Sequence, residues 1–390
     1  MPLPLERIRV VDFSTLLPGP LATLMLARAG ATVVKIEPPG GEGMRRLGLG
    51  SAAADRAAFD LLNAGKRSVC ADLKSERDAK RVRALIRGAD VLVEQFRPGV
   101  MQRLGFGYAA MKELNPGLIY CSITGYGADG PLSGHAGHDL NYMARSGVLG
   151  LSPGTQGAGC VPPVLAADIA GGSYPAFFNI LLALLARGQG GEGQHIQVAM
   201  AENLFPFAFW ALASGWGGGV WPSPAAGMLT GGSARYRLYR TKDNRFVALG
   251  AIEDKFWREF CRAIGLPDAL AQMDSRKQEV AAAVAQIIAS HDACHWRGVF
   301  EAADCCATLV ERLEDAVRDP HFVARGLFPG GKVSPAPAGG SGPVRLPLPL
   351  SQAFDALAAV PQGVKAPEAG ADDALLEQGW AGLDAGDEEG

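Results

Sequence analysis

The sequence has few of the features that mark secreted, zinc-binding or nucleic-acid-binding proteins. Its seven cysteines are scattered, and none forms a CxxC pair. An odd number of unclustered thiols argues against a disulfide framework and against a zinc knuckle, so we expect free cysteines. Lys and Arg total 37 against 40 Asp and Glu, a formal net charge of -3. This balance lacks the basic excess that nucleic-acid binding requires.

Long apolar runs are also absent. The longest lies around residues 177–186, and a helix needs roughly 20 residues to span a bilayer. Residues 1–7 show no basic segment leading into an apolar one, so we expect no signal peptide. We therefore expect a cytoplasmic protein with no membrane partner.

Metal and dinucleotide motifs are sparse. His291 and His295 are four residues apart with Cys294 between them, which puts both imidazoles on one face of a helix. No motif such as HExxH accompanies them, so we expect no metal. Residues 13–20, which follow the first apolar run, lack the GxGxxG motif of dinucleotide-binding proteins. This argues against a bound dinucleotide but leaves a Rossmann-like architecture open.

The first 130 residues alternate apolar, β-branched runs with segments of helical spacing. Continuous apolar strands separated by helices are typical of a parallel sheet that is covered on both faces. We therefore predict an α/β fold with a Rossmann-like large domain. The expected strands are 9–13, 31–36, 68–73, 90–95 and 118–123, and the expected helices are 17–29 and 76–87.

The second half of the chain predicts a smaller α+β domain. Residues 235–239 and 245–251 have the pattern of two antiparallel strands joined by a turn. The full set of expected elements is a helix at 173–187, a strand at 195–199, helices at 201–213, 254–264, 276–290 and 295–303, an extended segment at 329–349 and a helix at 372–378. We predict 1–214 as the first part of the large domain, 215–232 as a linker, 233–326 as the small domain and 327–390 as a return segment that completes the large domain.

Three ionisable residues, His138, Asp168 and Glu253, stand in settings of small or apolar residues. Histidine is the side chain whose ordinary pKa lies nearest neutrality, and a carboxylate with a raised pKa can share proton transfer with it. Each residue also has a structural interpretation. His138 would be a solvated loop residue, Asp168 an N-cap of the helix that follows it, and Glu253 an exposed charge at a strand end.

The residue after His138, Asp139, is expected to cap a helix that begins at Leu140. Such a helix N-terminus favours negative charge, including that of an enolate oxygen. Arg97 and Arg103 follow the strand at 90–95, where arginines can hold ligand phosphates at strand C-termini.

Lys66, Arg67 and Lys74 add positive charge around the strand at 68–73. The alternative for all these cations is a solvated basic face.

In combination these residues resemble the family III CoA-transferase superfamily, and within it the α-methylacyl-CoA racemases. The resemblance covers about the full length in order and includes Phe96-Arg97-Pro98-Gly99-Val100. Its other segments are 9–12, 19–20, 31–37, 71–74, 124–127, 137–142, 168–172, 231–232, 249–253 and 319–321.

The resemblance implies an interlocked homodimer. In this family a large Rossmann-like domain is built from both chain ends, and the active site lies where one subunit's large domain meets the other's small domain. It further implies that His138 and Asp168 are the acid/base residues and that Glu253 supports the histidine of the partner. The implied CoA contacts are Ala71, Asp72, Leu73, Lys74, Gln95, Phe96, Arg97, Arg103, Gly137, Asp139, Leu140, Asn141 and Tyr142.

One position departs from the family pattern. Racemases have Arg directly after the acid of the second strand, whereas this chain has Pro38 after Glu37. Lys35 or Arg46 is the candidate to replace that phosphate contact.

The resemblance implies racemisation of 2-methylacyl-CoA thioesters through an enolate, as part of lipid metabolism. The acyl group would need an apolar slot, for which the candidates are Phe205, Phe207, Trp210 and Met228, although these residues also suit a plain core. No cofactor is expected, because coenzyme A is part of the substrate.

Two other functions compete with racemisation. A CoA-transferase would use Asp168 as a nucleophile and would close a Gly-rich loop, for which residues 217–219 are the candidate. Transferases of the superfamily typically lack His at position 138, so His138 favours the racemase. The third possibility is a CoA-binding protein without turnover.

Overall fold

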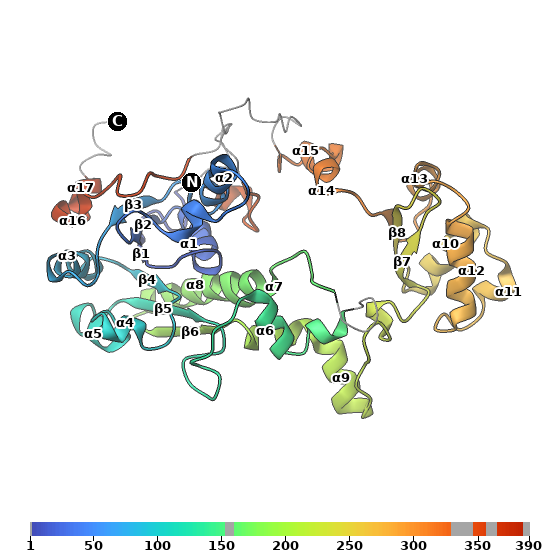
Figure 1. Cartoon of the computed structure of the whole chain (residues 1–390), viewed down its shortest axis with the longest axis horizontal. Coiled ribbons are helices and arrows are strands. Elements are labelled where there is room, and N and C mark those ends of the chain that lie inside the picture. The colour runs from blue at the N-terminus through green and yellow to red at the C-terminus, as the bar shows by residue number, and fades with distance from the viewer. Residues whose placement is uncertain (1, 153–159, 329–345, 356–364, 385–390) are drawn as a thin grey trace. The chain divides into compact units, whose positions relative to one another are not determined.

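The structure, a computed structural model, describes residues 2–152, 160–328, 346–355 and 365–384 (Figure 1). Its contacts divide the chain into two compact units. The first unit comprises Met1–Ser146, Val164–Phe205 and Val323–Gly390, and the second comprises Gly147–Pro163 and Pro206–Phe322. Of the extended segment expected at 329–349, residues 329–345 lie outside the described part of the chain.

A six-stranded parallel sheet forms the centre of the first unit, which confirms the prediction of a parallel sheet. Its order is β3-β2-β1-β4-β5-β6, the order of doubly wound α/β folds, and the order reverses between β1 and β4. The strands are β1 (Arg9–Asp12), β2 (Thr32–Glu37), β3 (Arg67–Cys70), β4 (Val91–Glu94), β5 (Ile119–Thr124) and β6 (His195–Ala199).

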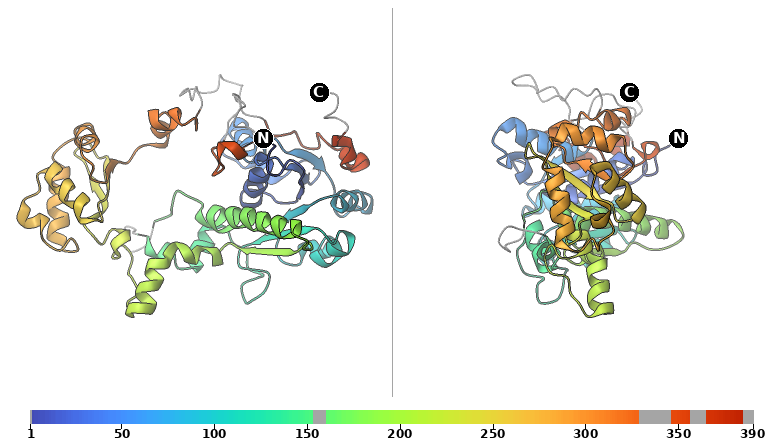
Figure 2. Two further views of the ribbon diagram at one scale, coloured as in Figure 1. Left: turned by 180° about the vertical axis from the view of Figure 1, so that it is seen from behind. Right: turned by 90° about the vertical axis from the view of Figure 1, so that its right-hand side faces the viewer.

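Helices cover both faces of this sheet. On one face, α3 (Glu76–Arg87), α5 (Tyr108–Leu114) and α16 (Leu375–Gln378) pack in a single apolar cluster with alternate residues of the strands. On the other, α1 (Pro18–Arg28) and α8 (Tyr174–Gly188) contact the strands, and α2 (Ala52–Asn63) packs on α1. Figure 2 shows α8 running along the sheet from the reverse side. Because both faces are covered, the central strands are apolar on both sides.

The apolar helix of this unit is longer than its sequence predicts. A turn of α7 (Ala166–Asp168) and a π-helical stretch (Ile169–Ser173) precede α8 without a break. The combined helix, Ala166–Gly188, has 23 residues, and an 18-residue window within it has a mean hydropathy of 1.6, enough to span a membrane by length and composition alone. The expectation of no such segment considered only the shorter run at 177–186. In this unit the helix contacts α1, β5 and β6.

The end of the described chain returns to the edge of the sheet. Asp372 and Asp373 accept hydrogen bonds from the backbone N–H groups of Ser68 and Cys70 in β3, at 2.8 and 2.7 Å. The Trp380 indole donates to the Leu85 carbonyl at 2.8 Å. These contacts satisfy edge-strand donors that would otherwise be open to another chain. The helix expected from residue 372 begins at Leu375.

The second unit contains an antiparallel sheet of β7 (Tyr236–Arg240), β8 (Phe246–Gly250) and β9 (Ala307–Leu309), as the sequence predicts for its first two strands. Trp257, Phe260 and Trp296 fill the core between this sheet and its helices. The helices of the core are α10 (Asp254–Ile264), α12 (Gln278–Ile288) and α13 (Ala293–Glu301).

Part of the expected linker is helical. Residues 215–218 belong to α9 (Phe209–Gly218), and Gly219 ends that helix in the left-handed conformation. Residues 217–219 therefore do not form the free Gly-rich loop that a transferase would close. The remaining helical elements are Gly43–Arg46, α4 (Val100–Arg103), α6 (Asp139–Arg145), Leu149–Leu151, Glu202–Ala208, Met228–Thr230, α11 (Asp268–Ala271), α14 (Leu313–Ala316), α15 (Pro320–Ala324), Gln352–Phe354 and α17 (Ala381–Asp384).

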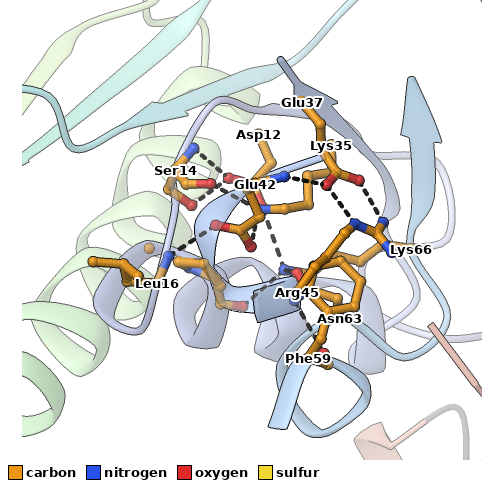
Figure 3. Close-up of polar contacts among 12 residues, drawn as sticks. Asp12, Ser14, Leu16, Lys35, Glu37, Glu42, Arg45, Phe59, Asn63 and Lys66 are labelled. Carbon is orange, nitrogen blue, oxygen red and sulfur yellow. Dashed lines mark hydrogen bonds and ion pairs between the residues drawn. The ribbon is translucent and has the colours of Figure 1, made fainter. Parts of the chain in front are cut away.

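A buried ion pair joins β1 to the start of β3. The Lys66 Nζ lies 3.3 Å from Asp12 Oδ2, and both side chains are fully buried. Lys66 also donates to the Thr23 hydroxyl and the Asn63 side-chain oxygen, at 2.8 Å each (Figure 3). Burial lowers the pKa of Lys66 to about 8, against the opposing effect of Asp12. Lys66 is therefore neither a free cation for a ligand phosphate nor part of a solvated basic face, so both interpretations of this residue are wrong.

Removing one partner of this pair should be costly, because the other charge stays buried without compensation. We expect Lys66→Ala to lower the free energy of unfolding by about 3–5 kcal/mol, measured by urea denaturation. Arg262→Ala, which breaks an exposed pair with Glu259, is the control and should change it little. Equal effects of the two substitutions would contradict a structural role for the Lys66 pair.

Candidate active site

A pocket of about 420 Å³ lies at the carboxyl ends of β1, β4 and β5. These strand ends flank the boundary between β1 and β4, where ligands bind in open α/β sheets. The lining residues come from at least five segments of the first unit that are far apart in sequence. They include Thr15, Leu16 and Pro18, then Gln95–Pro98, then Ile123–Tyr126, and finally His138, Asn141, Tyr142 and Asp168.

The wall after β1 is held by buried charges. Leu16 has a φ of 60°, an uncommon backbone conformation for a residue other than Gly. Its N–H donates to Glu42 Oε2 at 3.0 Å, and Lys35 lies 3.2 Å from the other oxygen of Glu42. The Lys35 Nζ also donates to the Ser14 carbonyl at 2.7 Å (Figure 3). Lys35 is thus internal and cannot replace the phosphate contact that is missing at Pro38.

The other candidate for that contact, Arg46, remains near the surface. Its guanidinium donates to the Gly40 carbonyl at 3.0 Å. Its role toward a phosphate stays a prediction.

The wall after β4 contains Gln95, Phe96 and Arg97. The Gln95 side-chain oxygen accepts from the Gly19 N–H at 2.8 Å, which fixes this loop against the start of α1. A Cβ at Gly19 would lie 2.1 Å from the Ser14 Cβ, so only glycine allows this approach. Arg97 is exposed in the pocket and is close enough to Tyr142 to affect the pKa of its hydroxyl.

His138 is also exposed in the pocket, at the start of α6. Its backbone N–H donates to the Asn141 side-chain oxygen at 3.0 Å. The Tyr142 hydroxyl donates to the Gly137 carbonyl at 2.5 Å. A Cβ at Gly125 would lie 2.4 Å from the Tyr142 ring, so the glycine makes room for it. These contacts fix the backbone on both sides of His138.

Asp139 caps a different helix from the one its sequence position predicts. It is the first residue of α6, and its Oδ1 accepts from the N–H groups of Ala167 and Asp168, at 2.6 and 3.0 Å. Asp139 therefore satisfies free donors in the first turn of α7. Asp168 lies within that first turn, so its expected role as an N-cap is wrong.

Asp168 and His138 both line the pocket. Burial and the nearby negative charge of Asp139 raise the pKa of Asp168 to about 6, while His138 acts in the opposite direction. A carboxyl group with this pKa can hold or release a proton near neutrality, which is the property that general acid–base chemistry needs.

The predicted CoA contacts separate into three groups. The pocket includes Gln95, Phe96, Arg97, Gly137, Asn141 and Tyr142. The second group follows β3, the edge strand that β2 separates from β1, and does not line the pocket. It consists of Ala71, Asp72, Leu73 and Lys74. Arg103 ends α4, Leu140 is exposed on α6, and Asp139 is buried behind the pocket. The structure thus brings together about half of these residues.

The third predicted acid/base residue, Glu253, belongs to the second unit. It is exposed between β8 and the first residue of α10. Its predicted support of His138 stays a prediction.

Several pocket residues were not predicted as site residues: Thr15, Leu16, Pro18, Ser133, His135 and Met200. Two signals could have indicated part of this set. The unusual Ser14–Pro20 turn lies directly after the first strand, and His135 lies in the same Gly-rich stretch as His138.

A larger pocket of about 810 Å³ lies within the second unit. Phe207, Trp210, Leu229 and Leu238 give it a largely apolar lining. Of the four residues expected in an acyl slot, Phe207 and Trp210 line this pocket. Phe205 and Met228 are exposed and do not line it.

The first unit therefore has the architecture of an α/β enzyme with an imidazole and a carboxyl group in one pocket at its strand ends. A sequence model of CoA-transferase family III matches residues 5–362. The chain belongs to this family.

Relatives of two kinds match over most of the chain. Human alpha-methylacyl-CoA racemase is 35% identical over 360 residues, which cover 90% of this chain and 88% of the relative. The acetyl-CoA:oxalate CoA-transferase of Acetobacter aceti is 32% identical, with coverage of 83% and 85%. A crystal structure of Rv3272 from Mycobacterium tuberculosis matches with a TM-score of 0.79 and 28% identity, covering 96% of this chain and 99% of that one.

The raised pKa of Asp168 has a consequence for stability. Between pH 3.8 and about 6 the folded chain binds more protons at Asp168 than the unfolded chain does, so stability falls as the pH rises through this window. We expect Asp168→Asn to raise the free energy of unfolding at pH 7.5 by about 1–3 kcal/mol. Urea denaturation at several pH values measures it.

The gain should disappear at about pH 4, where Asp168 is largely protonated. Asp274→Asn, at an exposed aspartate of the second unit, is the matched control and should show no gain at pH 7.5. A loss of stability in Asp168→Asn at pH 7.5 would contradict the raised pKa.

Proposed function

We propose that this chain racemises 2-methylacyl-CoA thioesters and that His138 and Asp168 move the α-proton. The observation that supports this proposal most strongly is the presence of both side chains in one pocket, with the pKa of Asp168 near 6. Racemisation needs two groups that can each accept and donate a proton near neutral pH. A histidine and a carboxyl group with a raised pKa meet that requirement.

In one direction, His138 removes the α-proton and the electrons of the C–H bond form an enolate with the thioester carbonyl. A protonated Asp168 then delivers its proton to the opposite face of the α-carbon. In the other direction the roles exchange, so one proton is taken and one is returned in each turnover.

The coenzyme A part of the thioester fits the chemistry of the 420 Å³ pocket. Arg97 is exposed in this pocket and offers a cation to the phosphates of coenzyme A. Coenzyme A belongs to the substrate, and no separate cofactor takes part in this scheme.

The proposal includes a cytoplasmic, interlocked homodimer in which Glu253 of one subunit supports His138 of the other. An apolar surface supports the assembly part of it. Phe178, Leu182 and Leu185 are exposed on α8 at 50–61% of their full accessible area. Exposed apolar residues that cluster on one helix commonly mark a contact surface.

CoA transfer between carboxylic acids is the second candidate, supported by the 32% identity to the Acetobacter aceti transferase. In that reaction the Asp168 carboxylate attacks the thioester carbonyl, forms a mixed anhydride and releases the CoA thiolate. The thiolate then attacks the Asp168 carbonyl of the anhydride, which releases the donor acid and leaves Asp168 as a CoA thioester. The acceptor carboxylate attacks this thioester to form a second anhydride and again frees the thiolate, whose attack on the acceptor's carbonyl gives the new CoA thioester and regenerates Asp168. His138 has no necessary role in these steps.

Deuterium exchange distinguishes the two reactions. Incubation with (R)- or (S)-2-methyldecanoyl-CoA in heavy water should replace the α-proton and make the two epimers converge. We expect His138→Ala and Asp168→Ala each to slow the convergence of the two epimers by at least about 100-fold and to change the dissociation constant for free coenzyme A little. The control His295→Ala, in the second unit, should exchange at the wild-type rate.

Wild-type activity in His138→Ala would contradict the two-residue mechanism. No exchange in the wild type, together with CoA transfer to an added carboxylic acid, would establish the transferase instead. Binding of acyl-CoA with neither reaction would indicate a binding protein without turnover.

The phosphate role of Arg97 has its own test. Because hydrogen bonds to charged groups are the stronger ones, Arg97→Ala should raise the dissociation constant for free coenzyme A by about 10-fold or more. Isothermal titration calorimetry measures it, with Arg262→Ala as the control on an exposed arginine of the second unit. An unchanged affinity would remove Arg97 from the binding site.

A further inference from the structure

A second polar cluster lies behind the candidate active site, on three neighbouring strands. Glu94 of β4 and Ser122 of β5 are direct partners in the strand register, and His195 of β6 pairs with Tyr120, two residues before Ser122. Side chains alternate along a strand, so Glu94, Ser122 and His195 lie on the same face of the sheet. Glu94 and Ser122 are buried, at 6% and 7% exposure.

Ser122 lies between the other two side chains. Its Oγ lies 2.9 Å from His195 Nε2, and Ser122 and Glu94 stand opposite each other in the strand register. Burial raises the pKa of the Glu94 carboxyl group, and the Ser122 hydroxyl opposes this effect. Burial lowers the pKa of His195, which favours a neutral ring.

The last group in the cluster reaches the active-site loop. Glu94 Oε2 accepts from the backbone N–H of Phe96 at 2.8 Å. Phe96 and the next residue, Arg97, line both the 420 Å³ pocket and a smaller pocket of about 140 Å³ that also contains Glu94, Ser122 and His195. The same loop thus separates the buried cluster from the candidate ligand site.

The far end of the cluster is anchored by aromatic rings. The His195 ring stacks on Tyr108 with a centroid distance of 4.6 Å and an interplanar angle of 22°. It meets Tyr120 edge-on at 5.3 Å. Two contacts of this kind restrict the rotation of the imidazole, so Nε2 stays directed at Ser122.

We infer that Glu94, Ser122 and His195 are positioning residues that hold the backbone at Phe96 and thereby place Arg97 for an anionic ligand. This inference rests on the proposed binding of a CoA thioester at the 420 Å³ pocket. None of the three groups needs to touch the ligand or the transferred proton. Their common effect is on affinity through the geometry of the Arg97 loop.

Calorimetric titration of free coenzyme A tests this role. Ser122→Ala removes the link between His195 and Glu94, and we expect the dissociation constant to rise about fivefold, as for one lost hydrogen bond. In an Arg97→Ala background the same substitution should have no further effect, because coupled residues are not additive. With 2-methyldecanoyl-CoA, KM should rise while kcat stays within about twofold.

A conservative variant and a matched serine separate positioning from stability. Glu94→Gln keeps an oxygen acceptor for the Phe96 N–H and should retain most of the affinity, whereas Glu94→Ala should lose it. The control Ser68→Ala removes another buried serine, which donates to the Glu37 carboxylate at 2.5 Å. It should lower the melting temperature without changing the affinity for coenzyme A.

The inference would be overturned by wild-type affinity in a folded Ser122→Ala protein, or by an equal loss of affinity from Ser122→Ala with and without Arg97. A fall in kcat at constant KM would also overturn it. If the wild-type protein does not bind coenzyme A at all, the proposed function itself is refuted. Loss of affinity in the variants alone does not have this meaning, so the two failures can be distinguished.

Discussion

The candidate site depends on one carboxylate that joins two distant segments. Asp139 follows His138 directly in the chain, and its oxygen receives the first N–H groups of the helix that contains Asp168. The same contact sets both position and charge, since the nearby Asp139 helps to raise the pKa of Asp168. A neutral residue at position 139 could hold the helix and would leave Asp168 a weaker base. The same carboxylate therefore caps the helix and raises the pKa of Asp168.

Much of the fold follows from local patterns. The helices at Glu76–Arg87 and Asp254–Ile264 and the strand at His195–Ala199 have the bounds that their spacing predicts, because each has a clear apolar period and a distinct start. The helix at Ala52–Asn63 was missed. Its apolar residues pack on α1 and on the Gly43–Arg46 turn, so its place depends on tertiary contacts that a local pattern does not contain.

The site residues divide in the same way. His138, Asp168 and Arg97 could be selected from residue type, setting and resemblance, and the structure places all three at one pocket. The roles of Lys35, Lys66 and Asp139 could not, because a charge is the same in sequence whether it meets solvent or a buried partner. Lys35 and Lys66 neutralise buried carboxylates under the turn after β1. Their positive charge maintains the shape of the wall and is not offered to a ligand.

The return of the chain to β3 has a consequence for biosynthesis. The carboxylates that cover the N–H groups of Ser68 and Cys70 come from Asp372 and Asp373, about 300 residues later. During translation, the edge of the emerging sheet therefore stays unprotected until about 300 further residues have been added. An open strand edge is a template for association with other chains. A chain that lacks Asp372 and Asp373 would accordingly be more dependent on chaperones than the folded protein.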